Sequence, residues 1–192
     1  MEGDWSDRDL DSIDLSGCDL SRADLEGYIF NDAKLRGTIL RDADLYWASL
    51  FRADLTGADL RNSLLCGADL TEAKLEGADL RGANLGNDNL GGATQLQGAS
   101  LLGAKLDGTN LAGAEYDEAT LLPTGFDPVS SGLQRSQLKS ADVRFGSKQT
   151  FASLTAHLKA PSRKAGEWLN FAVPPIRRFI SIRSVTRQKV EV

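Results

Sequence analysis

The chain has 192 residues, enough for one domain with an appended segment, and a formal net charge of −5 at pH 7. Residues 1–130 carry a net charge of −14 and residues 131–192 one of +9, which indicates two physically different segments. The N-terminal residues are acidic and lack an apolar core, so we expect no secretory signal. No apolar run approaches the roughly 20 residues of a membrane span. Two cysteines are too few for a disulfide framework. We therefore expect a cytoplasmic protein with reduced thiols.

Residues 1–7 form a predicted N-terminal lead-in and cap, in which Trp5 covers the first part of a repetitive segment. That segment spans residues 8–122. Leucine recurs at every fifth position from Leu10 to Leu90, apart from a Phe at one place, and a second series follows from Leu96 to Leu121. A small residue, usually Ala, lies two positions before most of these leucines.

A period of five fits neither a helix nor a plain strand. Residues two apart in extended chain point to one side, so the Ala and Leu of a unit share a face. The next Ala is three positions on, and it stays inward only if the chain turns once per unit. Glycine is frequent two residues after the leucine, where it suits such a corner. Turns of about 90° close after four units, so coils of about 20 residues stack into a solenoid with a leucine core.

Units such as ADLEG, AKLRG, ADLTG, AKLEG, ADLRG and ANLGN stand in phase along residues 8–122. This segment closely resembles the pentapeptide-repeat family, whose units read roughly A(D/N)LXX. The resemblance implies an all-β solenoid, a right-handed quadrilateral β-helix with four units per coil. The tail would be irregular or partly helical.

Residues 20 apart should then stack, which predicts columns of outward charges. One face carries an arginine column and acidic residues: Arg41, Arg61, Arg81, Asp19, Asp59 and Asp79. We favour a structural Arg–Asp lattice there, with an anion site or a partner surface as alternatives. On another face Asp14, Lys34, Asp54 and Lys74 alternate in sign, which favours cross-strand ion pairs.

A third face is irregular, because Tyr28 and Asp88 occupy its small inward positions. Tyr28 is too large for an alanine position, so we expect a bulge or a projecting loop. Asp88 is costly to bury unpaired, and we expect it to accept hydrogen bonds from corner amides.

Outward aromatic residues also gather around the middle of the repeat. Tyr46, Trp47 and Phe51 are predicted near one corner, with Ile29 and Leu64 one coil away. Exposed apolar clusters and Trp or Tyr anchors are typical of interaction sites, so these five residues form the candidate partner surface. The alternative is that the C-terminal segment covers them.

The remaining features lie towards the C-terminus. The phase slips by one residue near residues 94–98, which we expect a corner bulge to absorb. Residues 123–130 form a Pro-rich cap in which Phe126 closes the core, and residues 131–192 form a basic tail, poorly ordered or with short helices. His157, the one histidine, has no ligand partner in the sequence pattern.

No metal-ligand cluster, phosphate loop or catalytic Ser/His/Asp register occurs in the sequence. We predict a non-enzymatic, protein-binding scaffold without a cofactor or a specific nucleic-acid motif. Its partner is an unidentified protein, with a homodimer as a further alternative. The resemblance also implies a DNA mimic that binds DNA gyrase, as quinolone-resistance members of the family do. An enzyme would require a pocket lined by Asp88 and Tyr28.

Overall fold

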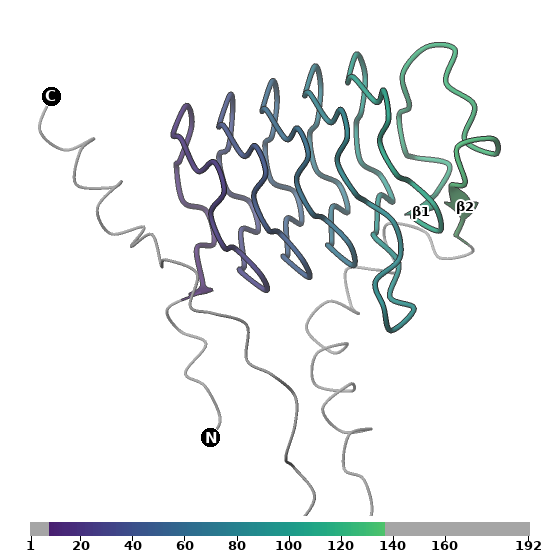
Figure 1. Cartoon of the computed structure of the whole chain (residues 1–192). Coiled ribbons are helices and arrows are strands. Elements are labelled where there is room, and N and C mark those ends of the chain that lie inside the picture. The colour runs from purple at the N-terminus through teal and green to yellow at the C-terminus, as the bar shows by residue number, and fades with distance from the viewer. Residues whose placement is uncertain (1–7, 137–192) are drawn as a thin grey trace, which may run out of the picture.

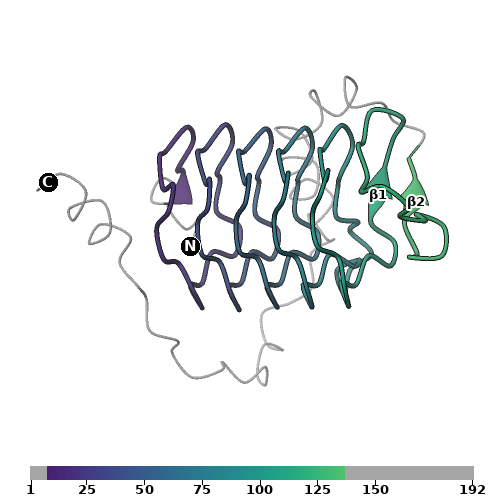
Figure 2. The ribbon, with the colours of Figure 1, turned by 90° about the horizontal axis from the view of Figure 1, so that it is seen from above.

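The computed structural model describes residues 8–136. The predicted cap residue Trp5, the basic tail from residue 137 onward and His157 lie outside the described residues. Across residues 8–136, no helix has the length and apolarity that a membrane span requires. The described chain forms a stack of coils (Figures 1 and 2).

Each coil contacts the next through parallel bridges, one on each of four faces. On the second face, for example, Asp24 pairs with Asp44, Asp44 with Leu64, and Leu64 with Asn84. Within residues 8–136, strands longer than one residue occur only in the last two coils, where β1 (Glu115–Tyr116) and β2 (Gln134–Arg135) pair in parallel. The predicted four-sided β-solenoid, with 20 residues in each regular coil, is confirmed.

The corners between faces have one repeated geometry. The amide of the small residue donates to the carbonyl of the leucine three positions before it, as from Ala58 to Leu55 at 2.9 Å. The second residue after the leucine has a positive φ, for instance 66° at Gly57. The frequency of glycine at this position therefore follows from the left-handed conformation that every corner requires.

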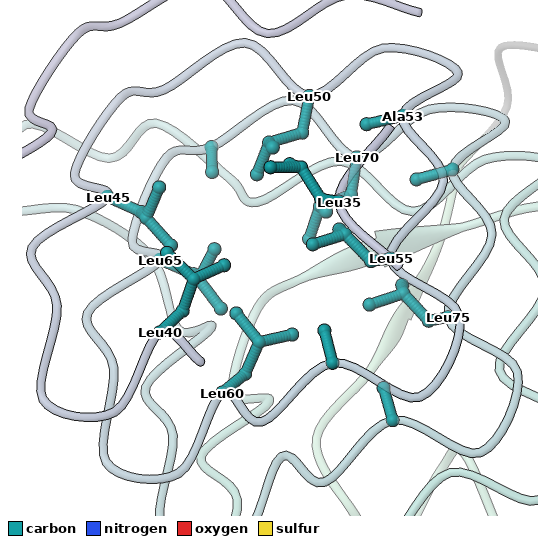
Figure 3. Packing of buried hydrophobic residues seen from close by; sticks show 14 of the residues in the cluster. Leu35, Leu40, Leu45, Leu50, Ala53, Leu55, Leu60, Leu65, Leu70 and Leu75 are labelled. Atoms are coloured by element: carbon teal, nitrogen blue, oxygen red, sulfur yellow. The ribbon is translucent and has the colours of Figure 1, made fainter. Parts of the chain in front are cut away.

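The core consists of leucine columns with small residues between them (Figure 3). Leu35, Leu55 and Leu75 follow one another on the fourth face, and Leu45 and Leu65 on the second. These side chains are at most 1% exposed. Since each coil has only a thin ring of apolar groups, burial depends on the neighbouring coils.

The phase change is an insertion rather than the predicted bulge at residues 94–98. Asp69 pairs with Gln95, so this coil is six residues longer than a regular one. The additional residues form a loop, residues 86–93, that projects beyond the stack in Figure 1. Leu90, assigned by its spacing to the core, is 75% exposed, and the buried Leu96 takes its place. The insertion of six residues is one residue longer than a repeat unit of five. The leucine spacing in the sequence therefore shifts by only one residue and does not reveal the rest of the insertion.

The inward position predicted for Asp88 belongs instead to Thr94, which is fully buried. Its hydroxyl donates to the carbonyl of Leu65 at 2.9 Å and accepts from the amide of Gly67 at 3.1 Å. These bonds satisfy a polar group inside the stack and hold the loop's end against the coil below.

Tyr28 produces no bulge, contrary to expectation. Its backbone keeps the regular bonds, because its amide donates to Leu25 and its carbonyl accepts from Ser49. The half-buried ring stacks on Phe30 with centroids 6.0 Å apart, and the Arg8 guanidinium lies over it. Tyr28 thus packs beside Arg8, near the N-terminal end of the described stack.

The ladder extends beyond the boundary predicted at residue 122. Strand β2 lies in residues assigned by sequence to the basic tail, and it continues the third face above β1. Leu133 is buried in the core, and Phe126 packs against it while partly exposed. Residues 123–136 therefore form the last turn of the stack.

Candidate interaction surface

Trp47 joins three coils at the corner between the second and third faces. It occupies the corner position where glycine is common and has a φ of 56°, a conformation unfavourable for a bulky residue. Its indole lies against Gly67 of the next coil: a Cβ added there would be 2.5 Å from Trp47 Cδ1. Its Nε1 donates to Asp88 Oδ2 at 2.5 Å. The indole thus connects the coil of Trp47 to the inserted loop.

Asp88 organises the loop itself. Its other carboxylate oxygen accepts from the amides of Leu90 at 2.8 Å and Gly92 at 2.6 Å. Its own amide donates to the Gly92 carbonyl at 2.8 Å. The predicted bonding of Asp88 to backbone amides is confirmed, although the amides belong to a loop rather than to a regular corner.

These bonds also set the charge of Asp88. Burial opposes ionisation, but the bonds from Trp47 and from the loop amides outweigh it, so the pKa of Asp88 lies below its ordinary value. The carboxylate is therefore charged at neutral pH, and it is used structurally. Tyr28 and Asp88 have separate partners, so the structure does not bring together the two residues of the predicted irregular site.

Tyr46 supports the same loop from the side. Its ring centroid lies 5.0 Å from that of Trp47, and its hydroxyl accepts from the Asn89 amide at 3.3 Å. Both rings are half-buried, and the insertion contacts them. The C-terminal segment, which the sequence offered as an alternative cover, lies outside the described residues. The exposed apolar groups nearby are Leu64, 42% exposed, and Leu90, 75% exposed at the loop tip.

The other two residues of the predicted partner surface are Ile29 and Phe51. Ile29 is half-buried on the third face, one coil from Ser49. Phe51 lies at the following corner, beyond Ser49, with the Arg52 guanidinium 5.9 Å from its ring centroid. No recorded contact within residues 8–136 joins Ile29 or Phe51 to Tyr46 or Trp47, so the five-residue partner surface stays a prediction. We use the name loop surface for Tyr46, Trp47, Leu64 and residues 86–92.

The predicted Arg–Asp lattice is present on the first face. Asp59 accepts from Arg61 at 2.9 and 3.0 Å and from Arg41 at 2.5 Å. Asp79 accepts from Arg81 at 2.8 and 2.7 Å. Asp19 instead accepts from Ser21, at 2.6 Å from the hydroxyl. The arginines of this column are thus used within the face, which leaves little charge for an anion.

The alternating column on the fourth face is confirmed as a ladder, since Asp14, Lys34, Asp54 and Lys74 pair in order. The closest ion pair differs from the predicted one. Asp54 pairs at 3.3 Å with Arg36, a corner residue of the preceding coil.

The lattice gives a prediction for stability against pH. Hydrogen bonds from Arg61 outweigh burial and, together with Arg41, lower the pKa of Asp59 to about 2 from its ordinary 3.8. A lowered pKa in the folded state contributes stability that is complete above pH 4 and lost as the pH falls towards 2. We expect Asp59→Asn to reduce the free energy of unfolding at pH 7 by about 2 kcal/mol and much less near pH 2.

Urea unfolding of both proteins across this pH range measures the difference. Asp107→Asn is the matched control, because Asp107 is exposed and forms no recorded ion pair. A difference between the native protein and Asp59→Asn that is independent of pH would contradict the assignment.

The second face contains acidic residues that the sequence did not single out. Asp24 and Asp44 pair directly across adjacent coils, and Glu26 follows Asp24 by two positions. Burial and the nearby charges of Asp44 and Asp24 raise the pKa of Glu26. The exposed Leu64 continues this column above Asp44. The column spacing of 20 would have located this cluster in the sequence.

Within residues 8–136, no group of three or more His, Cys, Asp or Glu side chains has a metal-binding arrangement. Both cysteines are free and buried. Sequence reasoning also missed Gly67 and Gly92. An added Cβ would meet Trp47 at the first and Asp88 at the second, both at 2.5 Å, so these glycines make room for the Trp47–Asp88 contact.

The pentapeptide repeats family matches the chain in eight copies, over residues 9–46 and 48–87. A solved pentapeptide repeat protein of Nostoc PCC 7120 is 37% identical to this chain. The match covers 60% of this chain and 86% of the Nostoc protein, with a TM-score of 0.35. The chain belongs to the pentapeptide-repeat family and has its right-handed β-helix fold. Members of this family are repeat scaffolds or interaction modules.

Two further solved structures are similar. Rfr23 from the cyanobacterium Cyanothece 51142 is 29% identical, with 61% of this chain and 92% of that chain covered and a TM-score of 0.47. QnrB1, a plasmid-mediated fluoroquinolone resistance protein, is 18% identical, with 84% and 94% covered and a TM-score of 0.48. Among curated proteins no sequence matches this chain.

Proposed function

We propose that the protein is a non-enzymatic scaffold that binds a partner protein through the loop surface. The observation that carries this proposal is Leu90, a large apolar side chain that is 75% exposed at the tip of a well-anchored loop. A soluble protein gains nothing by itself from such exposure, and contiguous exposed apolar groups mark interaction sites.

The anchoring of the loop supports the same proposal. Asp88, Trp47 and Tyr46 fix residues 88–92 by hydrogen bonds before any partner arrives. A preorganised loop loses little conformational entropy on binding, so more of the contact energy appears as affinity. The unfavourable φ of Trp47 fits this view, because backbone strain persists where the surrounding structure requires it and often accompanies function.

The test is capture of partners by the full chain and by variants of the exposed leucines. We expect Leu90→Ser combined with Leu64→Ser to lose the proteins that the native chain retains from a cell extract, since both side chains contribute apolar contact area. Leu102→Ser is the matched control, because Leu102 is 46% exposed at a different corner. Retention by the double variant, or equal loss in the control, would refute the loop surface as the binding site. Sedimentation of the same proteins tests the homodimer alternative.

The charge arrangement favours this proposal over DNA mimicry. A duplex mimic needs rows of unpaired acidic groups, whereas Asp54, Asp59 and Asp79 are paired with arginines on two faces. The gyrase alternative has in its favour the overall acidity of residues 1–130 and the acidic groups of the second face, Asp24, Asp44 and Glu26.

A further inference from the structure

The second face differs from the other faces in how its acidic groups are arranged. On the first face Asp59 and Asp79 also pair across coils, but arginine side chains neutralise each of them. On the second face Asp24 lies opposite Asp44, and no ion pair recorded within residues 8–136 includes either residue. Like charges directly opposite each other on a sheet reduce stability. The fold therefore bears an electrostatic cost here that it avoids elsewhere.

These acids are available to a partner. In the described part of the chain, the recorded ion pairs include neither Asp24, Asp44 nor Glu26. Asp24 and Glu26 are exposed, and Asp44 is half-buried. Each aspartate uses one carboxylate oxygen to accept an amide two residues on, from Glu26 at 3.3 Å and from Tyr46 at 3.1 Å. Among the described residues, no donor to the second oxygen of either carboxylate is recorded.

The acidic cluster is continuous with the loop surface. Leu64 is the next rung above Asp44, and the residue that donates its amide to Asp44 is Tyr46, which contacts the loop. Rungs are about 4.8 Å apart, so Asp24 and Leu64 are separated by about 10 Å. This distance corresponds to about three residues of an extended peptide.

We propose that the second face, from Asp24 and Asp44 to Leu64, binds a segment of the partner protein that carries basic residues followed about three positions later by a large apolar residue. Arginine or lysine of that segment pairs with the stacked aspartates, and the apolar residue lies on Leu64. This inference rests on the proposed function, because it specifies the chemistry of the partner at the same surface. It also explains why repulsion between Asp24 and Asp44 is retained: a basic group removes it on binding.

The experiment uses a fluorescein-labelled 12-residue peptide with two arginines and, three positions later, a leucine. A second peptide has serine in place of the leucine. Fluorescence anisotropy measures their binding to the full chain at low and at high salt. We expect the first peptide to bind at least tenfold more tightly than the second, and both to weaken as salt increases.

Variants separate this site from general attraction between charges. Asp24→Asn combined with Asp44→Asn should weaken binding of the first peptide at least tenfold. The thermal unfolding midpoint of this double variant should stay the same as that of the native protein or rise, because a repulsion between carboxylates is removed. The control, Asp107→Asn combined with Asp127→Asn, changes the net charge equally at exposed positions away from this face. Equal weakening in the control, or no binding of the first peptide to the native chain, would overturn the proposal.

The two proposals fail differently. If the variant of Leu64 and Leu90 loses its captured partner but the variant of Asp24 and Asp44 keeps it, the loop surface binds a protein and the basic-segment inference is wrong. If neither variant changes capture, the proposed function fails as well.

Discussion

Leu55→Asp is expected to abolish the folded rod. Leu55 is fully buried in the middle of its column, with Leu35 and Leu75 in the coils on either side. Removing a buried leucine side chain alone costs about 2–5 kcal/mol. The aspartate adds the desolvation of a carboxyl group that has no polar partner in the leucine column. Because a small domain is stable by only about 5–15 kcal/mol, little or no stability remains.

Circular dichroism and urea unfolding measure this effect. We expect Leu55→Asp to lose the cooperative transition of the native chain. Leu102→Asp provides the control, since the same substitution at a 46% exposed side chain places the carboxylate in water. A native-like transition in Leu55→Asp would show that coils on either side can fold without that position, as weakly coupled repeats do.

Gly67→Ala is expected to release the inserted loop. Gly67 has a φ of 68°, so any other residue is strained there by about 1–2 kcal/mol. The added Cβ would also lie 2.5 Å from Trp47 Cδ1 and 2.7 Å from its Nε1, too close for any real contact. Trp47 must move, and its bond to Asp88 is lost. Overpacking of this kind costs about a further 1–3 kcal/mol.

Gly57→Ala isolates the steric part of this effect. Gly57 has nearly the same φ, 66°, but an added Cβ meets nothing within 4 Å. Thermal unfolding should therefore show a larger loss in Gly67→Ala than in Gly57→Ala. Hydrogen exchange of the Leu90 and Gly92 amides should accelerate only in Gly67→Ala, because Asp88 no longer holds the loop. Equal effects of the two substitutions would mean that Trp47 adapts without disturbing Asp88.

Much of the fold is a local property of the sequence. The step of two from Ala to Leu, the step of three to the next Ala, and the corner glycines are each visible within a few residues. They predict the four faces, the leucine columns and the Arg–Asp lattice, because every unit repeats the same conformation. Asp88 was also assigned correctly to bonding with backbone amides, since aspartates in turns accept such hydrogen bonds.

The predictions that failed concern contacts between distant residues. Leu90 kept the leucine phase, and nothing local distinguished an insertion of six residues from a slip of one. Only the pairing of Asp69 with Gln95 revealed the loop. The loop then determined the surroundings of Trp47 and Tyr46, which lie 41 and 43 residues from their partners Asp88 and Asn89.

The sequence by itself determined that this chain forms a leucine-filled solenoid, because the repeat specifies the path of each coil without reference to the others. The tertiary structure decided which outward groups meet across coils. It joined Trp47, Gly67 and Asp88 into one support for Leu90. The physical reason is that the inserted loop changes the register between coils, and surface neighbours depend on that register rather than on local sequence.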